Sequence, residues 1–229
     1  MSGNGNWDRA RWLWSLALLA GASYFTAVLQ HWDGPAIWAW KASGVGLLAL
    51  WAAANARGRD GWAIAAVLAL GALGDWLLDA RGLTVGAIAF AAGHVVAITL
   101  YLINRRPRLT GSQAALAILT VPLAVAISWA LTRGVAGSGA AIGYTALVAA
   151  MAASAWASRF SRYRTGLGAM LFLASDLFIF AGEGGALSKA MTMWLVWPLY
   201  FAGQALIAWG VVTAHAAGRS SESTGRSIG

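Results

Sequence analysis

The sequence contains no cysteine and little charge, and these two absences exclude several kinds of protein at once. Without cysteine, the chain has no disulfide, no haem thiolate, no cysteine-based zinc site and no cysteine nucleophile. Charged residues make up only 10% of its 229 residues, whereas hydrophobic residues make up 59%. A soluble chain of this length would need far more charge on its surface. The composition therefore indicates an integral membrane protein.

Several familiar catalytic motifs are absent too. The sequence has no Gly-x-Ser-x-Gly elbow, no phosphate-binding P-loop and no His-Glu-x-x-His. Ser175 directly precedes Asp176, but adjacent residues on a helix do not face each other, so this pair is not part of a triad. Any chemistry must come from residues outside these patterns.

Apolar runs follow one another along nearly the whole chain, each long enough to cross about 30 Å of hydrocarbon. Because most of the polar breaks between them are short, neighbouring helices should be antiparallel and adjacent. The expected spans are residues 12–30, 35–55, 61–79, 84–103, 113–132, 138–157, 166–183 and 191–213. We expect an all-α bundle of eight transmembrane helices over residues 1–214, followed by a polar, disordered tail over 215–229.

The basic residues are spread unevenly over the loops. With the N-terminus inside, twelve of the sixteen Lys and Arg residues fall in inside segments and only Arg81, Arg133 and Lys189 fall in outside loops. This asymmetry predicts that both termini are cytoplasmic. The net charge of +8 therefore reflects membrane topology, and we expect no nucleic-acid partner. The expected location is a cell membrane, the inner membrane of a bacterium.

Ionisable residues within the spans are the candidates for a functional site, because they are costly in lipid unless they are paired or face a wet cavity. A rise of about 1.5 Å per residue places Asp75 about 6 Å and Lys41 about 9 Å from the outer ends of their helices. His94 and Asp176 each lie about ten residues into their helices, about 15 Å deep and near the midplane of the membrane. Since these depths converge, we expect the side chains to line one cavity that opens outward. The candidates are Lys41, Asp75, Asp79, His94, Asp176 and Glu183.

Several candidates also have a purely structural explanation. Lys41 is as well suited to pair with Asp75 as to bind a substrate. A lone His94 is more often an interhelical hydrogen-bonding residue than a catalyst. Asp79 and Glu183 sit at span ends, where we expect them to be solvated.

Asp75 and Asp176 are the hardest to explain structurally, because each follows a small residue inside an apolar run. Two carboxylates in one cavity suit general acid–base chemistry, in which one is protonated and the other ionised. His94 is the only histidine at depth, so we expect no metal and no other cofactor.

Five short motifs, taken in order, resemble those of the YhhN / transmembrane protein 86 family, the lysoplasmalogenases. Each motif alone is weak, but five in the right order on an eight-span chain are fairly specific. They are the Lys of "WAWKASG", Gly-Asp-x-x-Leu from Gly74 to Leu78, Gly-x3-Phe-x3-His at Gly86, Phe90 and His94, Gly-x3-Phe-x2-Ser-Asp at Gly168, Phe172, Ser175 and Asp176, and Tyr-x3-Gln at Tyr200 and Gln204.

The resemblance implies a membrane hydrolase that cleaves the vinyl ether bond of lysoplasmalogens, giving a fatty aldehyde and a glycerophospho-head group. It implies Asp75 and Asp176 as catalytic residues, and His94 could assist them by passing protons. The expected partners are a lysophospholipid substrate and membrane lipids. The residues expected to bind substrate are Lys41, Ser175, Tyr200 and Gln204.

Two other classes remain open at this point. A small-molecule or proton-coupled transporter could use the same buried Asp, His and Lys residues as a relay, although the sequence shows no inverted repeat. A lipid-binding or assembly protein could use Lys41 and Asp75 only to fix packing. The oligomeric state is also open, because glycine-rich faces serve packing within a chain as readily as between chains.

Overall fold

The computed structural model describes residues 10–226, with side chains described as far as Ala214. Its eight long helices are all long and apolar enough to span a membrane, which confirms the predicted fold class. A short π-helical turn, η1 (Arg162–Gly166), leads into the seventh of them. The helices are α2 (Arg11–Leu29), α3 (Pro35–Ala54), α4 (Gly58–Arg81), α5 (Leu83–Ile103), α6 (Gly111–Thr132), α7 (Ser138–Ala157), α8 (Leu167–Glu183) and α9 (Lys189–Arg226).

Local sequence signals account for several helix boundaries. Pro35 occupies the first turn of α3, where its missing N–H is not needed. Before α6, the backbone N–H of Thr110 donates to Gln113 Oε1 at 3.2 Å, as in a capping box. Only Gly82 separates α4 from α5, and its φ of +93° is a conformation that glycine adopts without a steric penalty.

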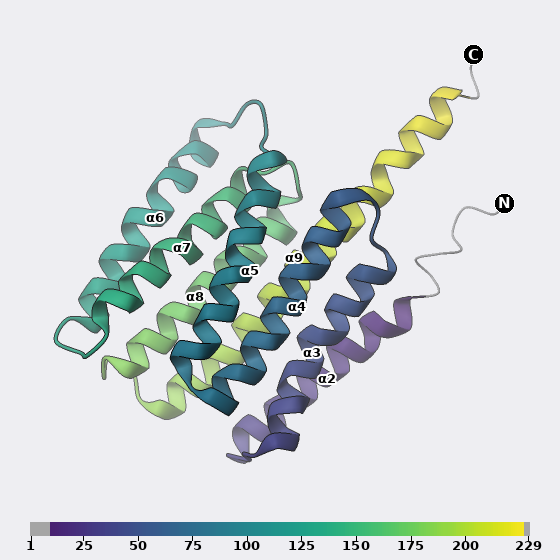
Figure 1. Ribbon diagram of the computed structural model, residues 1–229. Helices are drawn as coiled ribbons and strands as arrows, with labels where there is room; N and C mark the ends of the chain where they lie inside the picture. The colour runs from purple at the N-terminus through teal and green to yellow at the C-terminus, as the bar shows by residue number, and fades with distance from the viewer. Residues whose placement is uncertain (1–9, 227–229) are drawn as a thin grey trace.

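The helices form an antiparallel bundle in which α9 packs against α2, α3, α4 and α8, while α5 packs against α4 and α7 (Figure 1). The start of α2 and the end of α9 lie at the same end of the bundle. We call this the basic end, because its loops at 55–57, 104–110 and 158–161 carry most of the loop arginines. Its assignment to the cytoplasm stays a prediction.

Large apolar side chains cover the outside of the bundle. Leu19, Ile103 and Ile118 expose 65%, 77% and 70% of their surfaces, respectively. Such a surface would be an aggregation hazard in water, whereas in a bilayer it contacts lipid chains. The exposed apolar surface therefore agrees with the membrane assignment.

The motif glycines allow close approach between helices. A Cβ atom at Gly74 would lie 2.8 Å from the ring of Phe90, and one at Gly86 would lie 2.7 Å from the Cα atom of Leu78. In the other half, a Cβ atom at Gly168 would lie 2.6 Å from the carbonyl oxygen of Gly203. These glycines therefore bring α4 against α5 and α8 against α9.

The ends of the chain leave one sequence prediction untested. The predicted disordered tail begins at residue 215, and the side chains after Ala214 and all of residues 227–229 lie outside the described residues. The predicted boundary between residues 214 and 215 stays a prediction.

Candidate active site

Asp75 on α4 belongs to a closed hydrogen-bonded group with two residues of α9. The hydroxyl of Tyr200 donates to Asp75 Oδ2 at 2.7 Å, and Gln204 Nε2 donates to the same hydroxyl at 3.4 Å. All three side chains are buried. Gly71 makes room for the amide, because a Cβ atom there would lie 2.8 Å from Gln204 Nε2.

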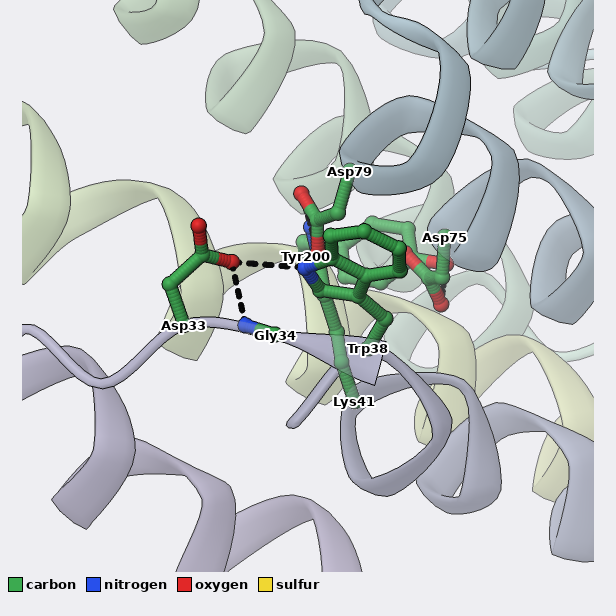
Figure 2. A network of polar contacts seen from close by, with 7 residues as sticks. All are labelled: Asp33, Gly34, Trp38, Lys41, Asp75, Asp79 and Tyr200. Atoms are coloured by element: carbon green, nitrogen blue, oxygen red, sulfur yellow. Dashed lines mark hydrogen bonds and ion pairs between the residues drawn. The ribbon is translucent and has the colours of Figure 1, made fainter. Parts of the chain in front are cut away.

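One helical turn beyond Asp75, a second carboxylate forms an ion pair with Lys41 of α3 (Figure 2). Lys41 Nζ lies 2.9 and 3.0 Å from the two carboxylate oxygens of Asp79. Only 13% and 21% of the two side chains are exposed, so each charge needs the other. From the sequence we expected Lys41 either to pair with Asp75 or to bind substrate, and we expected Asp79 to be solvated. The ion pair forms instead with Asp79.

Figure 2 also shows an exposed carboxylate in the loop before α3. Asp33 Oδ1 accepts hydrogen bonds from the Trp38 indole at 2.6 Å and from the Gly34 N–H at 2.7 Å. The bond from Trp38, followed by that from Gly34, lowers the pKa of Asp33 below its ordinary value. Asp33 thus has its hydrogen-bond partners in the loop and at the start of α3 and is separate from the buried groups.

On the other side of the bundle, Asp176 of α8 lies with Tyr144 of α7 and His94 of α5. The tyrosine hydroxyl interacts with the carboxyl group of Asp176 and lies 3.4 Å from His94 Nε2. His94 is also held edge-on against Phe172, with ring centroids 4.9 Å apart. Asp176 Oδ2 is buried and has no hydrogen-bond partner among the described residues.

A cavity of about 250 Å³ begins at Asp176 and runs towards the end of the bundle opposite the basic end. Helices α5, α7 and α8 form most of its wall, which is largely apolar. Glu183 and the residues that follow α6 lie near its mouth. It is lined by Leu78, Leu83, Thr84, Ala87, Phe90, Thr132, Val135, Ala136, Gly137, Ser138, Ala140, Ala141, Tyr144, Asp176, Ile179, Phe180 and Glu183. No lysine or arginine lines it, among the residues that the structure describes.

Three aromatic rings in mutual contact connect the wall of this cavity to Asp75, because Phe90 lines the cavity, Tyr200 donates to Asp75 and Phe172 packs against both rings. The centroids of Phe90, Phe172 and Tyr200 are 5.2 to 6.1 Å apart, and each pair meets edge to face. We call these three rings the aromatic partition. Asp75 does not line the cavity, so the expectation of one cavity shared by all the deep polar residues is wrong. Their depths converge, but ring packing separates them.

A second, much smaller cavity of about 10 Å³ lies deeper in the bundle, behind the partition. His94, Gln204 and Tyr101 line it, together with apolar residues of α4, α5, α7, α8 and α9. We call it the inner cavity. It touches a member of each polar group, His94 on the Asp176 side and Gln204 on the Asp75 side.

The remaining sequence-predicted residues lie as follows. Ser175 is fully buried and its hydroxyl donates to the Phe172 carbonyl at 2.6 Å, so it reaches neither cavity. Glu183 is exposed, as expected for a span end. Among residues 10–214, no three His, Asp or Glu side chains come together as metal ligands would.

Sequence reasoning missed Tyr144 and the role of Phe90. Tyr144 lies six residues after the start of α7 and is the only tyrosine in that helix. This position could have marked it as a candidate site residue. Phe90 stands in the motif that contains His94, four residues earlier. Both escaped notice because neutral aromatic residues are cheap to bury, unlike carboxylates.

Comparison with known proteins places the chain in a membrane-protein family. Residues 36–211 match the YhhN family, and this range includes every candidate site residue named above. The chain therefore belongs to the YhhN family, as its ordered motifs indicated. No curated protein and no solved structure matches the chain.

Proposed function

We propose that this protein is a lysoplasmalogenase-like hydrolase that cleaves the vinyl ether bond of a single-chain phospholipid. One observation carries the proposal: a buried carboxyl group, Asp176, lies at the inner end of an apolar cavity that opens at one end of a membrane bundle. Membership of the YhhN family is consistent with this reaction. The fit to a lipid rests on the apolar wall of the cavity.

The shape of the cavity favours a lipid with one chain. A volume of about 250 Å³ is small for a phospholipid with two chains, but it accepts part of one chain and the group next to it. Glu183, Thr84 and Ser138 bring polar atoms to the wall nearer the mouth. A polar head group would remain at this mouth while the vinyl ether reaches Asp176.

Asp176 would act as the general acid. In its protonated form it donates a proton to the vinyl ether carbon that is not bonded to oxygen, which leaves an oxocarbenium ion. A water molecule adds to this cation and loses a proton, and the resulting hemiacetal collapses to aldehyde and alcohol. One water is consumed and no net proton is released. This series of reaction steps resembles glycoside hydrolysis, which also passes through an oxocarbenium-like state. The resemblance is an analogy only.

Tyr144 and His94 would orient Asp176 and receive the proton from the attacking water. The Tyr144 hydroxyl contacts both the carboxyl group and the imidazole, so it links the two. Imidazole accepts a proton at one nitrogen and releases one from the other, which suits it to pass protons. Asp75 does not line the cavity and would therefore act from a distance.

The test is aldehyde release from a lysoplasmalogen by the purified protein in detergent. Wild-type protein and an Asp33→Asn control should release aldehyde, whereas Asp176→Asn should lose at least about 1000-fold in kcat, because the acid is removed. The elution profile and thermal midpoint of each variant check its folding. A well-folded wild type without activity would refute the proposal. Substrate accumulation in sealed vesicles would then favour a transporter.

A further inference from the structure

We propose that the inner cavity binds one water molecule, held by His94, Tyr101 and Gln204, and that this water joins the two carboxyl groups in one proton path. The path would run from Asp176 through Tyr144 and His94 to the water. From there the Gln204 carbonyl oxygen would take a proton from the water while its Nε2 gives one to Tyr200, whose hydroxyl passes its own proton to Asp75. The return of a proton along the same path would restore the Gln204 amide from its imidic acid form. It passes behind the aromatic partition, which otherwise separates the two acids.

The first half of the path consists of contacts between described side chains. Tyr144 contacts Asp176 and lies 3.4 Å from His94 Nε2. The other ring nitrogen, Nδ1, has no hydrogen-bond partner among residues 10–214, and the ring lines the inner cavity. An imidazole with one nitrogen on Tyr144 can therefore use the other for a group in that cavity.

The second half is equally continuous. Tyr200 donates to Asp75 at 2.7 Å and accepts from Gln204 at 3.4 Å. The amide of Gln204 also lines the inner cavity. The two halves therefore end on opposite walls of the same small space, and no hydrogen bond between His94 and Gln204 joins them directly.

Tyr101 supplies the independent observation that points to a ligand. This residue is 1% exposed, its ring lines the inner cavity, and its buried hydroxyl has no hydrogen-bond partner among the described residues. Leaving a buried hydroxyl without a hydrogen bond is costly, so such groups nearly always bind protein or water. A water in the cavity would satisfy it.

The size and polarity of the inner cavity suit a single water. A buried water needs a probe volume of at least roughly 10–15 Å³ and two to four polar partners. The cavity offers about 10 Å³, and the polar residues among those that line it are His94, Tyr101 and Gln204.

The role of this water rests on the proposed function. After each turnover Asp176 has given a proton to carbon, and the attacking water has released one. The path would let Asp75 take up that released proton and return one to Asp176, with no net gain or loss. The residues that restore the proton of Asp176 without touching substrate would then be positioning residues, namely Asp75, Tyr101 and Gln204.

The first experiment is a structure of the wild-type protein at a resolution that shows waters. We expect one ordered water within about 3.2 Å of the Tyr101 hydroxyl and also of His94 or Gln204. An inner cavity without water, or a Tyr101 hydroxyl bound to another protein group, would overturn the proposal. This result does not depend on activity, so it decides the proposal even if the enzyme proposal fails.

The second experiment is kinetic and uses Tyr101→Phe, which removes only the hydroxyl. We expect kcat for aldehyde release to fall about tenfold with KM unchanged, and the solvent deuterium isotope effect to rise as proton return becomes limiting. Gln204→Met should behave alike, and the double variant should be no worse than either, because both break one path. Tyr24→Phe, a buried tyrosine outside both cavities, is the matched control.

Unchanged kcat and isotope effect in Tyr101→Phe would exclude the proton path even if the water is seen. A rise in KM with unchanged kcat would also contradict it, because that result would place Tyr101 in substrate binding. If wild-type protein releases no aldehyde while the structure shows the water, the proposed function fails and the water site stands.

Discussion

The two buried aspartates stand in very different surroundings. Asp75 accepts a short hydrogen bond from Tyr200, packs behind the aromatic partition, and has the Lys41–Asp79 ion pair one turn away. Asp176 Oδ2 has no hydrogen-bond partner among residues 10–214, and Asp176 faces a cavity of about 250 Å³. Buried polar groups are normally satisfied by protein, so an unsatisfied one at a cavity is available to a ligand. Burial alone would have ranked the two acids as equals.

The comparison separates groups that hold the bundle together from groups that face a substrate. Helices α3, α4 and α9 carry polar residues that are paired with one another. Helices α5, α7 and α8 carry residues that surround the cavity. A charged or polar residue within a membrane is therefore a functional candidate only until its partner is known.

The most direct test of this difference between Asp75 and Asp176 is to neutralise each aspartate in turn. Asp176→Asn should lose at least about 1000-fold in kcat, because it removes the group that meets the substrate. Asp75→Asn should lose only about 10- to 100-fold with KM unchanged, since the asparagine still fits beside Tyr200 but cannot take up a proton. Steady-state aldehyde release measures both. Equal losses would mean that both acids touch the substrate and that the partition opens.

A second prediction concerns the Lys41–Asp79 ion pair. Lys41→Met should destabilise the fold by about 1–3 kcal/mol, because it leaves the Asp79 carboxylate mostly buried and unpaired. Lys41→Met with Asp79→Leu should recover most of this stability and retain wild-type KM. Thermal midpoints in detergent and lysoplasmalogen kinetics are the measurements. A double variant that is stable but has a greatly raised KM would instead support the substrate-binding role that we expected for Lys41 from the sequence.

The smallest expected effect lies at the mouth of the cavity. Within the described part of the chain, Glu183 and Asp176 are the acidic residues that line the cavity, and Glu183 is exposed. Glu183→Gln should raise KM about two- to fivefold for lipids with a cationic amine in the head group and leave kcat unchanged, as expected for a solvated charge pair. Head groups without an amine serve as the control. An equal rise in KM for lipids with and without an amine would show that Glu183 does not interact with the head-group charge.

Much of the fold follows from the sequence because apolar runs are local features. All eight predicted spans coincide with helices to within a few residues at most boundaries. The largest difference is at α9, which continues to Arg226 whereas the predicted span ends at residue 213. The sequence also shows no sign of η1, because no breaker or period marks a π-helical turn before α8. Asp75 and Asp176 were identifiable as candidates since carboxylates within apolar runs are rare.

The grouping of the site residues was not predictable, because it depends on non-local geometry. Asp75 and Asp79 share one face of α4, so only the relative height of α3 decides which of them meets Lys41. Likewise, Phe90 and Phe172 separate the two acids through the rotation of α5 and α8 and the directions of their rings. The spacing of residues within one helix does not predict its height or rotation relative to another helix.

The one-residue connection at Gly82 has a consequence for biogenesis. Helices α4 and α5 can enter the bilayer only as a hairpin, so Asp75, Phe90 and His94 acquire their mutual heights early in synthesis. Asp176 and Tyr200 emerge from the ribosome later and must dock onto this preformed half. Co-expressed fragments divided within the 133–137 loop should therefore reassemble, whereas division at Gly82 separates the hairpin itself.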